Sequence, residues 1–167
     1  MKYVCVITAI CLAFIGSTST SFAQGLITEH MLPSDMAETI ARGAIDQCRS
    51  MGFHISVSVI DSSGLLKAFL RDEDTGPHTI NLSRAKAYTA LTLASRFATS
   101  GEFASDRNST LGSPMTNIEG VVGIAGGVPI RVGKEVIGAV GSSGAVGGAN
   151  DEICAKAGIA KVADRLR

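Results

Sequence analysis

The residues best suited to chemistry lie around His78. This histidine ends a Gly-Pro-His sequence at 76–78, in a loop that leads into a predicted helix containing Arg84 and Lys86. Imidazole serves as an acid, a base or a metal ligand near neutral pH, and arginine and lysine bind carboxylates. We therefore take His78 as the first candidate binding residue, with Arg84 and Lys86 as candidate anion partners. Arg71, just before the same loop, is a comparable candidate.

Other interpretations of the same residues stay open. His78 could cap the helix or bind a surface water, and basic residues on a helix commonly lie on a solvated face. Paired with Lys86 or Glu102, His78 would suit acid–base chemistry on a small hydroxy or oxo acid. The acidic residues at 72–74 would offer oxygen ligands to a divalent cation, although their spacing fits no strong metal motif.

Glycines in the C-terminal half allow two interpretations. Gly126 and Gly127 permit another backbone to approach closely, either for packing or as the floor of a ligand pocket. The glycines at 138–144 are similar to a nucleotide-binding loop, but Asp151 and Glu152 stand at the start of the next helix, where their charge would repel a phosphate. We therefore expect packing, rather than a nucleotide, at that loop.

The first 23 residues are typical of a cleaved signal peptide. A positive charge, an apolar run at 4–15 and small residues ending at Ala23 place the cleavage before Gln24. The apolar run is too short to span a membrane comfortably. We expect a periplasmic or secreted protein whose mature chain, residues 24–167, forms a single domain without a membrane span.

Two of the four cysteines, Cys5 and Cys11, would leave with the signal peptide. Cys48 and Cys154 remain, in a compartment that permits disulfides. They either form a bridge or act as two small buried hydrophobic side chains. If the first and last predicted helices pack antiparallel on one face of a sheet, the two sulfurs lie close enough to bridge.

Charge and aromatic content exclude several partners. The full chain has 15 Lys and Arg and 15 Asp and Glu, so loss of Lys2 with the signal peptide leaves a mature chain with a net charge close to zero. No run of like charges occurs. Nucleic acid is therefore not an expected partner. The sequence has no tryptophan and only 5% aromatic residues, which supplies no stacking platform for bases or sugars.

Hydrophobic periodicity predicts an antiparallel sheet covered by helices. The order is helix, hairpin, helix, hairpin, helix, without the regular strand–helix alternation of parallel sheets. In the last helix, Asn150 is the expected N-cap and Ile153 is expected to point inward. The expected elements are a helix at 34–51, strands at 55–59 and 65–71, a helix at 79–99, a short helix at 102–106, strands at 128–132 and 135–140, and a helix at 151–166.

Three ordered motifs resemble the GlcG/HbpS family of haem-binding proteins. They are SRAKAYTA at 83–90, GGVPI at 126–130 and GAVGSSGA at 138–145, and Asp151, Ala155 and Gly158 match the closing helix of the family. The resemblance covers essentially the whole mature chain. It implies a profilin-like α/β (α+β) sandwich with a central antiparallel sheet of about five strands covered by helices. It also implies assembly into homo-oligomers.

The resemblance further implies haem as the cofactor. Haem iron takes an axial ligand such as histidine from an apolar pocket, with polar groups at the rim for the propionates. Of the three histidines, His78 is the preferred iron ligand because it lies directly before the first motif. Arg71, Arg84 and Lys86 are then the candidate propionate partners, beside the candidate floor at 126–127.

Two functions follow as hypotheses. The leading one is an exported haem-binding protein for storage, delivery or redox sensing, and a binding protein rather than an enzyme. The alternative is an enzyme or accessory protein acting on a small hydroxy or oxo acid, as in glycolate metabolism, with which the family is also associated. An interaction module for another exported protein is a third possibility.

Overall fold

A four-stranded antiparallel sheet forms the centre of the molecule. The computed structural model describes residues 25–106 and 114–167, so the predicted signal peptide lies outside the described residues. The strand order is β2-β1-β4-β3. The strands are β1 (Ser56–Asp61), β2 (Leu66–Arg71), β3 (Gly127–Val132) and β4 (Glu135–Ser143). Both predicted hairpins are confirmed, whereas about five strands were expected and these four are found in the described part of the chain.

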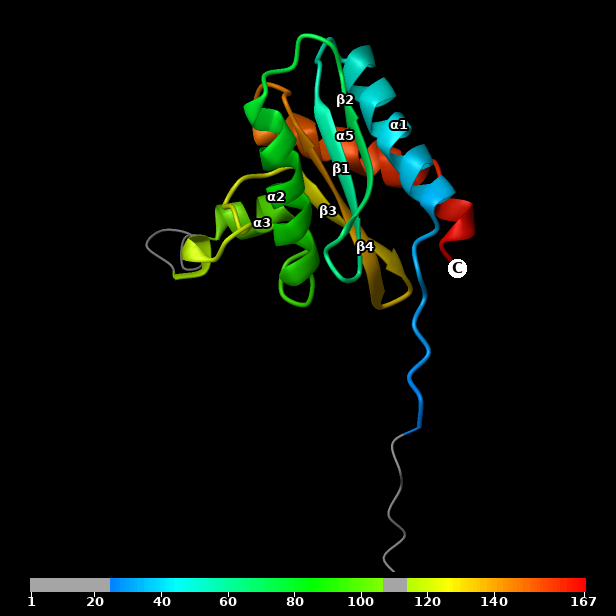
Figure 1. The fold of residues 1–167 in the computed structure, drawn as a ribbon. Helices are drawn as coiled ribbons and strands as arrows, with labels where there is room; N and C mark the ends of the chain where they lie inside the picture. Colours follow the sequence, from blue (N-terminus) through cyan, green and yellow to red (C-terminus); the bar gives the residue numbers. More distant parts are fainter. Residues whose placement is uncertain (1–24, 107–113) are drawn as a thin grey trace, which may run out of the picture.

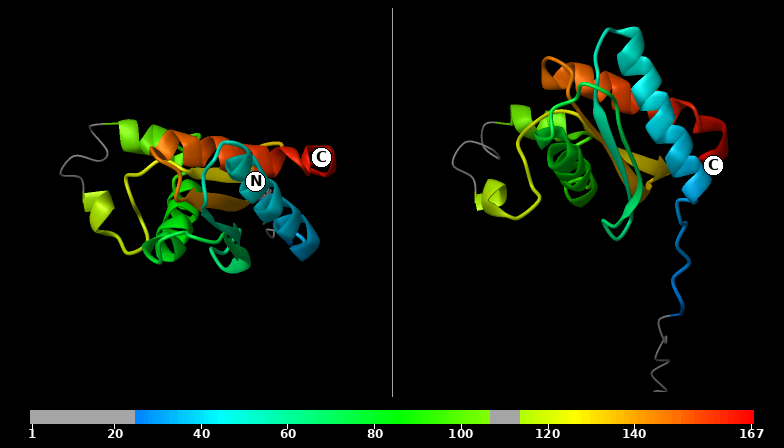
Figure 2. Two further views of the ribbon diagram at one scale, coloured as in Figure 1. Left: turned by 90° about the horizontal axis from the view of Figure 1, so that it is seen from above. Right: turned by 45° about the horizontal axis from the view of Figure 1, so that its top comes forward.

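Helices cover both faces of this sheet (Figures 1 and 2). Helix α1 (Ser34–Ser50) and helix α5 (Gly148–Ala160) lie on one face, and helix α2 (His78–Thr92) lies on the other. Shorter pieces are α3 (Ser100–Ser105) and two 3₁₀ turns, Pro114–Asn117 and Ala163–Arg165. The predicted fold class, an antiparallel sheet covered by helices, is confirmed.

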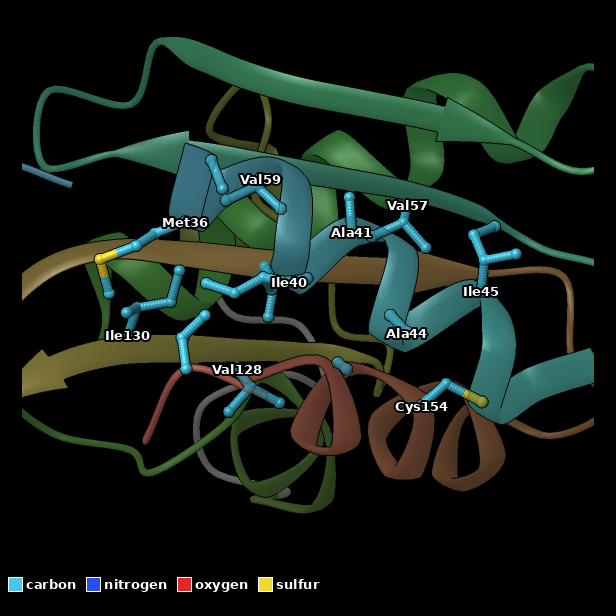
Figure 3. Close-up of a cluster of buried hydrophobic side chains, with 14 of the residues drawn as sticks. Met36, Ile40, Ala41, Ala44, Ile45, Val57, Val59, Val128, Ile130 and Cys154 are labelled. Atoms are coloured by element: carbon cyan, nitrogen blue, oxygen red, sulfur yellow. The ribbon is translucent and has the colours of Figure 1, made fainter. Parts of the chain in front are cut away.

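The main core lies between the sheet and the pair α1 and α5 (Figure 3). Strand β1 directs Val57 and Val59 toward this layer, and α1 meets them with Ile40 and Ala44, all fully buried. Successive strand residues point to opposite faces, and the apolar residues of α1 recur at helical spacing. The apolar face of α1 therefore packs against the sheet.

The serines of β1 are buried as well. They alternate with the valines and face α2, where Ser56 Oγ lies 2.7 Å from Thr79 Oγ1 and Ser58 Oγ lies 2.8 Å from Ser83 Oγ. Each hydroxyl thus has a partner away from water, as buried polar groups require. In β1, polar and apolar residues alternate although both faces of the strand are covered by helices, and neither face is exposed to solvent.

Helix α2 lies almost directly on the backbone of the sheet. A Cβ atom built at Gly141 would come within 2.0 Å of the Ser83 carbonyl oxygen, and one at Gly127 would come within 2.0 Å of the Lys86 carbonyl oxygen. Only glycine leaves room for this approach. We expected the glycines at 138–144 to permit close packing, and Gly141 does so against α2.

Three predicted helix boundaries need correction. Helix α2 ends at Thr92 rather than 99, and Thr99 caps α3 by accepting from Glu102 N–H. Helix α5 begins at Gly148 and ends at Ala160, and Asn150 is not its cap.

The orientation of α5 also differs from the prediction. Ile153, expected to point inward, is 47% exposed. The buried face of α5 consists of Asp151, Cys154, Ala155 and Gly158.

A disulfide joins α1 to α5. The Cα atoms of Cys48 and Cys154 lie 5.5 Å apart and the two sulfurs are bonded, which settles the alternative left open by the sequence. Near the other end of α1, Arg165 donates to Asp35 at 2.7 Å, so the two helical segments run antiparallel, as expected. Among the described residues, no helix has the length and apolar character needed to cross a membrane.

The disulfide spans 106 residues, and we predict that it contributes substantially to stability. Closing a loop of this length in the unfolded chain stabilises the fold by about 4 kcal/mol. Cys48→Ala/Cys154→Ala should therefore lower the free energy of unfolding in urea by roughly that amount. A reducing agent should destabilise the wild type and leave the double variant unchanged. Equal unfolding midpoints for wild type and double variant would contradict the prediction.

Candidate functional site

An open hollow of about 250 Å³ contains His78. The lining comes from helix α2, from the end of β4, from the turn into α5 and its first residues, and from Ile124. The lining residues are His78, Leu82, Lys86, Ile124, Ser143, Gly144, Ala145, Gly148 and Asp151. Pockets that enclose small ligands are usually larger, about 300–1,000 Å³. A ligand held here by one copy of the chain would keep part of its surface outside.

His78 is the first residue of α2, and its side chain is exposed. The imidazole lies over Gly76, where an added Cβ would come within 2.8 Å of Cε1 and 2.9 Å of Nδ1. Pro77 occupies the N-cap position and offers no side-chain hydrogen bond. Thr79 donates its hydroxyl to Gly76 O at 2.7 Å and so closes the turn that carries His78.

Lys86 is not the surface cation that the sequence predicted. Its side chain is 2% exposed, and its Nζ donates to Asp151 Oδ2 at 2.6 Å and to Ser142 O at 3.1 Å. Burial raises the pKa of the Asp151 carboxyl, an effect that the Lys86 ammonium opposes. The charge of Lys86 is therefore balanced inside the protein rather than offered to a ligand.

The glycine pair at 126–127 supports this buried pair and does not line the hollow. Gly126 has a φ of +127°, and a Cβ there would come within 2.9 Å of Asp151 Cβ and 3.0 Å of Lys86 Cδ. Gly127 lies against the Lys86 carbonyl, as described above. Of the two interpretations left open for these glycines, close packing is the one that the structure displays.

Arg84 and Arg71 do not line the hollow that contains His78. Arg84 is exposed on α2 and does not line the hollow. Arg71 ends β2, donates to Thr75 O at 2.8 Å, and lines a different hollow of about 210 Å³ between α1 and β2. Of the candidate side chains, only those of His78 and Lys86 therefore share one site.

A second polar cluster, centred on Asp72, was not identified from the sequence. The Asp72 carboxylate is fully buried, accepts from Arg49 Nε at 3.0 Å, and also pairs with Arg49 Nη2. His54 Nδ1 lies 3.0 Å from Asp72 Oδ2, the oxygen that also accepts from Arg49 Nε. The Arg49 guanidinium holds the pKa of this carboxyl well below its usual range. The only sequence signal was an aspartate directly after a strand.

The Asp72 cluster fixes the loop that leads to His78. Asp72 N–H donates to Ile55 O at 2.9 Å, and its carboxylate also accepts from Glu73 N–H at 3.1 Å. The loop therefore starts from a rigid point at the end of β2. With both carboxylate oxygens engaged, Asp72 is not free to bind a cation. Within residues 25–106 and 114–167, no group of three or more His, Cys, Asp or Glu could hold a metal ion.

Acid–base chemistry with Glu102 finds no support in this geometry. Glu102 lies in α3, accepts from Ala98 N–H at 2.5 Å, and does not line the hollow with His78. What remains at the hollow is one exposed imidazole beside the apolar side chains of Leu82, Ile124 and Ala145. This arrangement suits a flat, largely apolar ligand that carries a metal.

Sequence comparisons point to one family. A family model described as "Haem degrading protein HbpS-like" matches residues 32–160. The protein GlcG of Escherichia coli is 32% identical over 119 residues, which cover 70% of this chain and 84% of GlcG.

Solved structures agree with the sequence comparisons. The crystal structure of HbpS has a TM-score of 0.74 and 30% identity, covering 83% of this chain and 96% of HbpS. A double mutant of Streptomyces reticuli HbpS gives the same TM-score and identity, covering 83% and 92%. A PduOC–haem complex has a TM-score of 0.70 at 22% identity, covering 79% and 95%, which is a likeness of fold alone.

The Asp72 cluster yields a prediction about acid stability. Because the folded pKa of Asp72 lies below its unfolded value of about 3.9, the cluster stabilises the fold above that pH and loses this contribution as the pH falls toward the folded pKa. Asp72→Asn should lower the melting temperature at neutral pH, at a cost of about 1–3 kcal/mol. Its melting temperature should also fall less steeply on acidification than that of the wild type.

The exposed residue Asp164 offers a matched control. Asp164→Asn should leave both the neutral melting temperature and its decline with acid close to those of the wild type. Parallel acid profiles for wild type and Asp72→Asn would show that Asp72 is not the titrating group.

Proposed function

This chain belongs to the HbpS-like family, and from that premise we propose that it is an exported haem-binding protein in which the imidazole of His78 ligates the iron. The observation that carries the proposal is the exposed His78 ring beside an open, partly apolar hollow. Family membership, the likeness to HbpS and the fold shared with a PduOC–haem complex support haem as the ligand.

The residues around the hollow fit the chemistry of the porphyrin. Histidine nitrogen is a common axial ligand to haem iron, and apolar side chains contact the ring. Leu82 and Ile124, both of which line the hollow, supply such contacts. Neither predicted propionate partner on α2 is available here, because Arg84 does not line the hollow and Lys86 is already paired with Asp151.

The openness of the site favours reversible binding. A hollow of about 250 Å³ does not enclose a porphyrin, so haem would keep an exposed portion from which it can be transferred or reached by an oxidant. Storage, delivery or redox sensing would each use such a site.

Export is supported by two independent features. The first 23 residues have the charge and apolar pattern of a signal peptide. Separately, Cys48 and Cys154 form a disulfide, a bond that persists in oxidising compartments and is rare in the cytosol. We propose cleavage before Gln24 and a periplasmic or secreted mature protein.

Haem binding can be tested by titrating the mature protein with haemin. A stoichiometric complex with a shifted Soret band is expected. His78→Ala should change the Soret position and weaken binding by at least about tenfold, equivalent to ~1.4 kcal/mol. His30→Ala is the matched control, because His30 contacts Glu135 at the opposite end of β4. Failure of the wild type to form a complex would refute haem binding.

Gly76→Ala refines the assignment of the ligand. The added methyl group would collide with the His78 ring and displace it, while the imidazole remains in the protein. We expect a shifted Soret band with binding retained. Unaltered spectra in both Gly76→Ala and His78→Ala would leave haem binding intact and reject His78 as the ligand.

Export can be tested by expressing the full chain in a bacterium that has a periplasm. The mature protein should appear in the periplasm or the medium, begin at Gln24 by mass spectrometry and contain no free thiol. Ala23→Arg should block cleavage, because signal peptidase needs a small residue there. Full-length protein with free thiols in the cytoplasm would contradict the proposal.

A further inference from the structure

The structure offers a role for the buried Lys86–Asp151 pair. We infer that the two residues act as positioning residues, which hold the turn at 144–148 in place as one wall of the His78 hollow. The inference rests on the proposed function for its consequence in haem binding. Its structural basis, the restraint of the turn, can be measured without haem.

The pair connects three elements beside the hollow. Lys86 extends from α2, Asp151 lies in the first turns of α5, and the Ser142 carbonyl belongs to β4. The two contacts of Nζ, 2.6 Å to Asp151 Oδ2 and 3.1 Å to Ser142 O, thus fix the separation of these elements. His78 lies on the same helix as Lys86, so its position relative to the turn depends on this connection.

Asp151 reaches the turn itself through its second oxygen. Oδ1 accepts from Ala145 N–H at 2.9 Å, and Ala145 lines the hollow opposite α2. Gly144 has a φ of +137° and Gly147 a φ of +81°, backbone conformations that glycine adopts without strain. Within the turn, Asn150 Nδ2 donates to Val146 O at 2.6 Å. The Asp151 carboxylate adds a restraint that connects the turn to α2 through Lys86.

A role in geometry explains the pair better than a role in stability. Removing two charges from water is costly, and apolar residues of similar volume often replace a buried ion pair with no loss of stability. Gly126 nevertheless leaves space for the pair, since a side chain there would collide with Asp151 Cβ and Lys86 Cδ. The fold thus makes room for the Lys86–Asp151 ion pair beside the hollow, despite the free-energy cost of removing both charges from water.

Two double variants separate geometry from stability. Both remove the ion pair, because Lys86→Met deletes the ammonium. Lys86→Met/Asp151→Asn keeps a side-chain oxygen that can accept from Ala145 N–H, whereas Lys86→Met/Asp151→Leu does not. The two proteins therefore differ chiefly in the bond to the turn.

Hydrogen exchange at the Ala145 amide and the Soret band of the haemin complex are the measurements. The Asn variant should match the wild type in exchange at Ala145 and, because it has lost the contacts of Lys86 Nζ, should show a smaller Soret shift than the Leu variant. The Leu variant should show faster exchange at Ala145, a shifted Soret band and affinity lower by about tenfold, with a urea midpoint similar to that of the Asn variant. Identical exchange and identical spectra in the two variants would overturn the inference.

Failure of the Leu variant to fold and failure of the wild type to bind haemin each have a separate consequence. If the Leu variant does not fold, Ala145→Pro removes the donor and leaves the ion pair intact, and it should produce the same spectral shift. If the wild type fails to bind haemin, the proposed function falls, while the exchange rate of Ala145 still decides whether the pair restrains the turn.

Discussion

The contact between α2 and the sheet is the constraint on which the rest of the structure depends. Because Gly127 and Gly141 carry no side chain, the helix backbone lies directly against β3 and β4. This proximity brings the serines of β1 within hydrogen-bonding distance of α2. It also carries Lys86 into the interior, where Asp151 must balance its charge. The place of His78 at the end of the same helix follows from these contacts.

The site combines a rigid frame with an open surface. On one side, Asp72 fixes the start of the loop that carries His78 through its bonds to Arg49, His54 and Ile55. On the other, Asp151 reaches the turn that faces it. The imidazole between them is exposed and free of such restraints except for its contact with Gly76. A ligand in the hollow would therefore contact an imidazole that can reorient, while the backbone on both sides of it is held in place.

Helices and strands with regularly spaced apolar residues were predicted well from the sequence. Helix α1 is strongly amphipathic, and its predicted range, 34–51, agrees with the observed Ser34–Ser50. Both predicted hairpins were found as well. Helix α5 was placed in the wrong phase because its inward face contains a charged residue and a glycine, while apolar Ile153 points outward.

The candidate site was harder to predict for the same reason. Lysine is almost never fully buried, so Lys86 was assigned to the surface and to the ligand. Its partner Asp151 lies 65 residues away, and no local pattern links the two. Asp72 and Arg49 are likewise separated, by 23 residues. His78 was chosen for its position at the start of a predicted helix, and the structure places it in the lining of the hollow. Its role as an iron ligand stays a prediction.

The antiparallel packing of α1 on α5 also bears on how the chain reaches its native state. Cys48 is synthesised long before Cys154, so for most of that time its thiol has no correct partner. Contacts that join the two ends of a chain form late, because the intervening loop must first be closed. Oxidation of these cysteines would therefore mark the completion of folding, and an earlier pairing of Cys48 with another thiol would trap the chain short of that point.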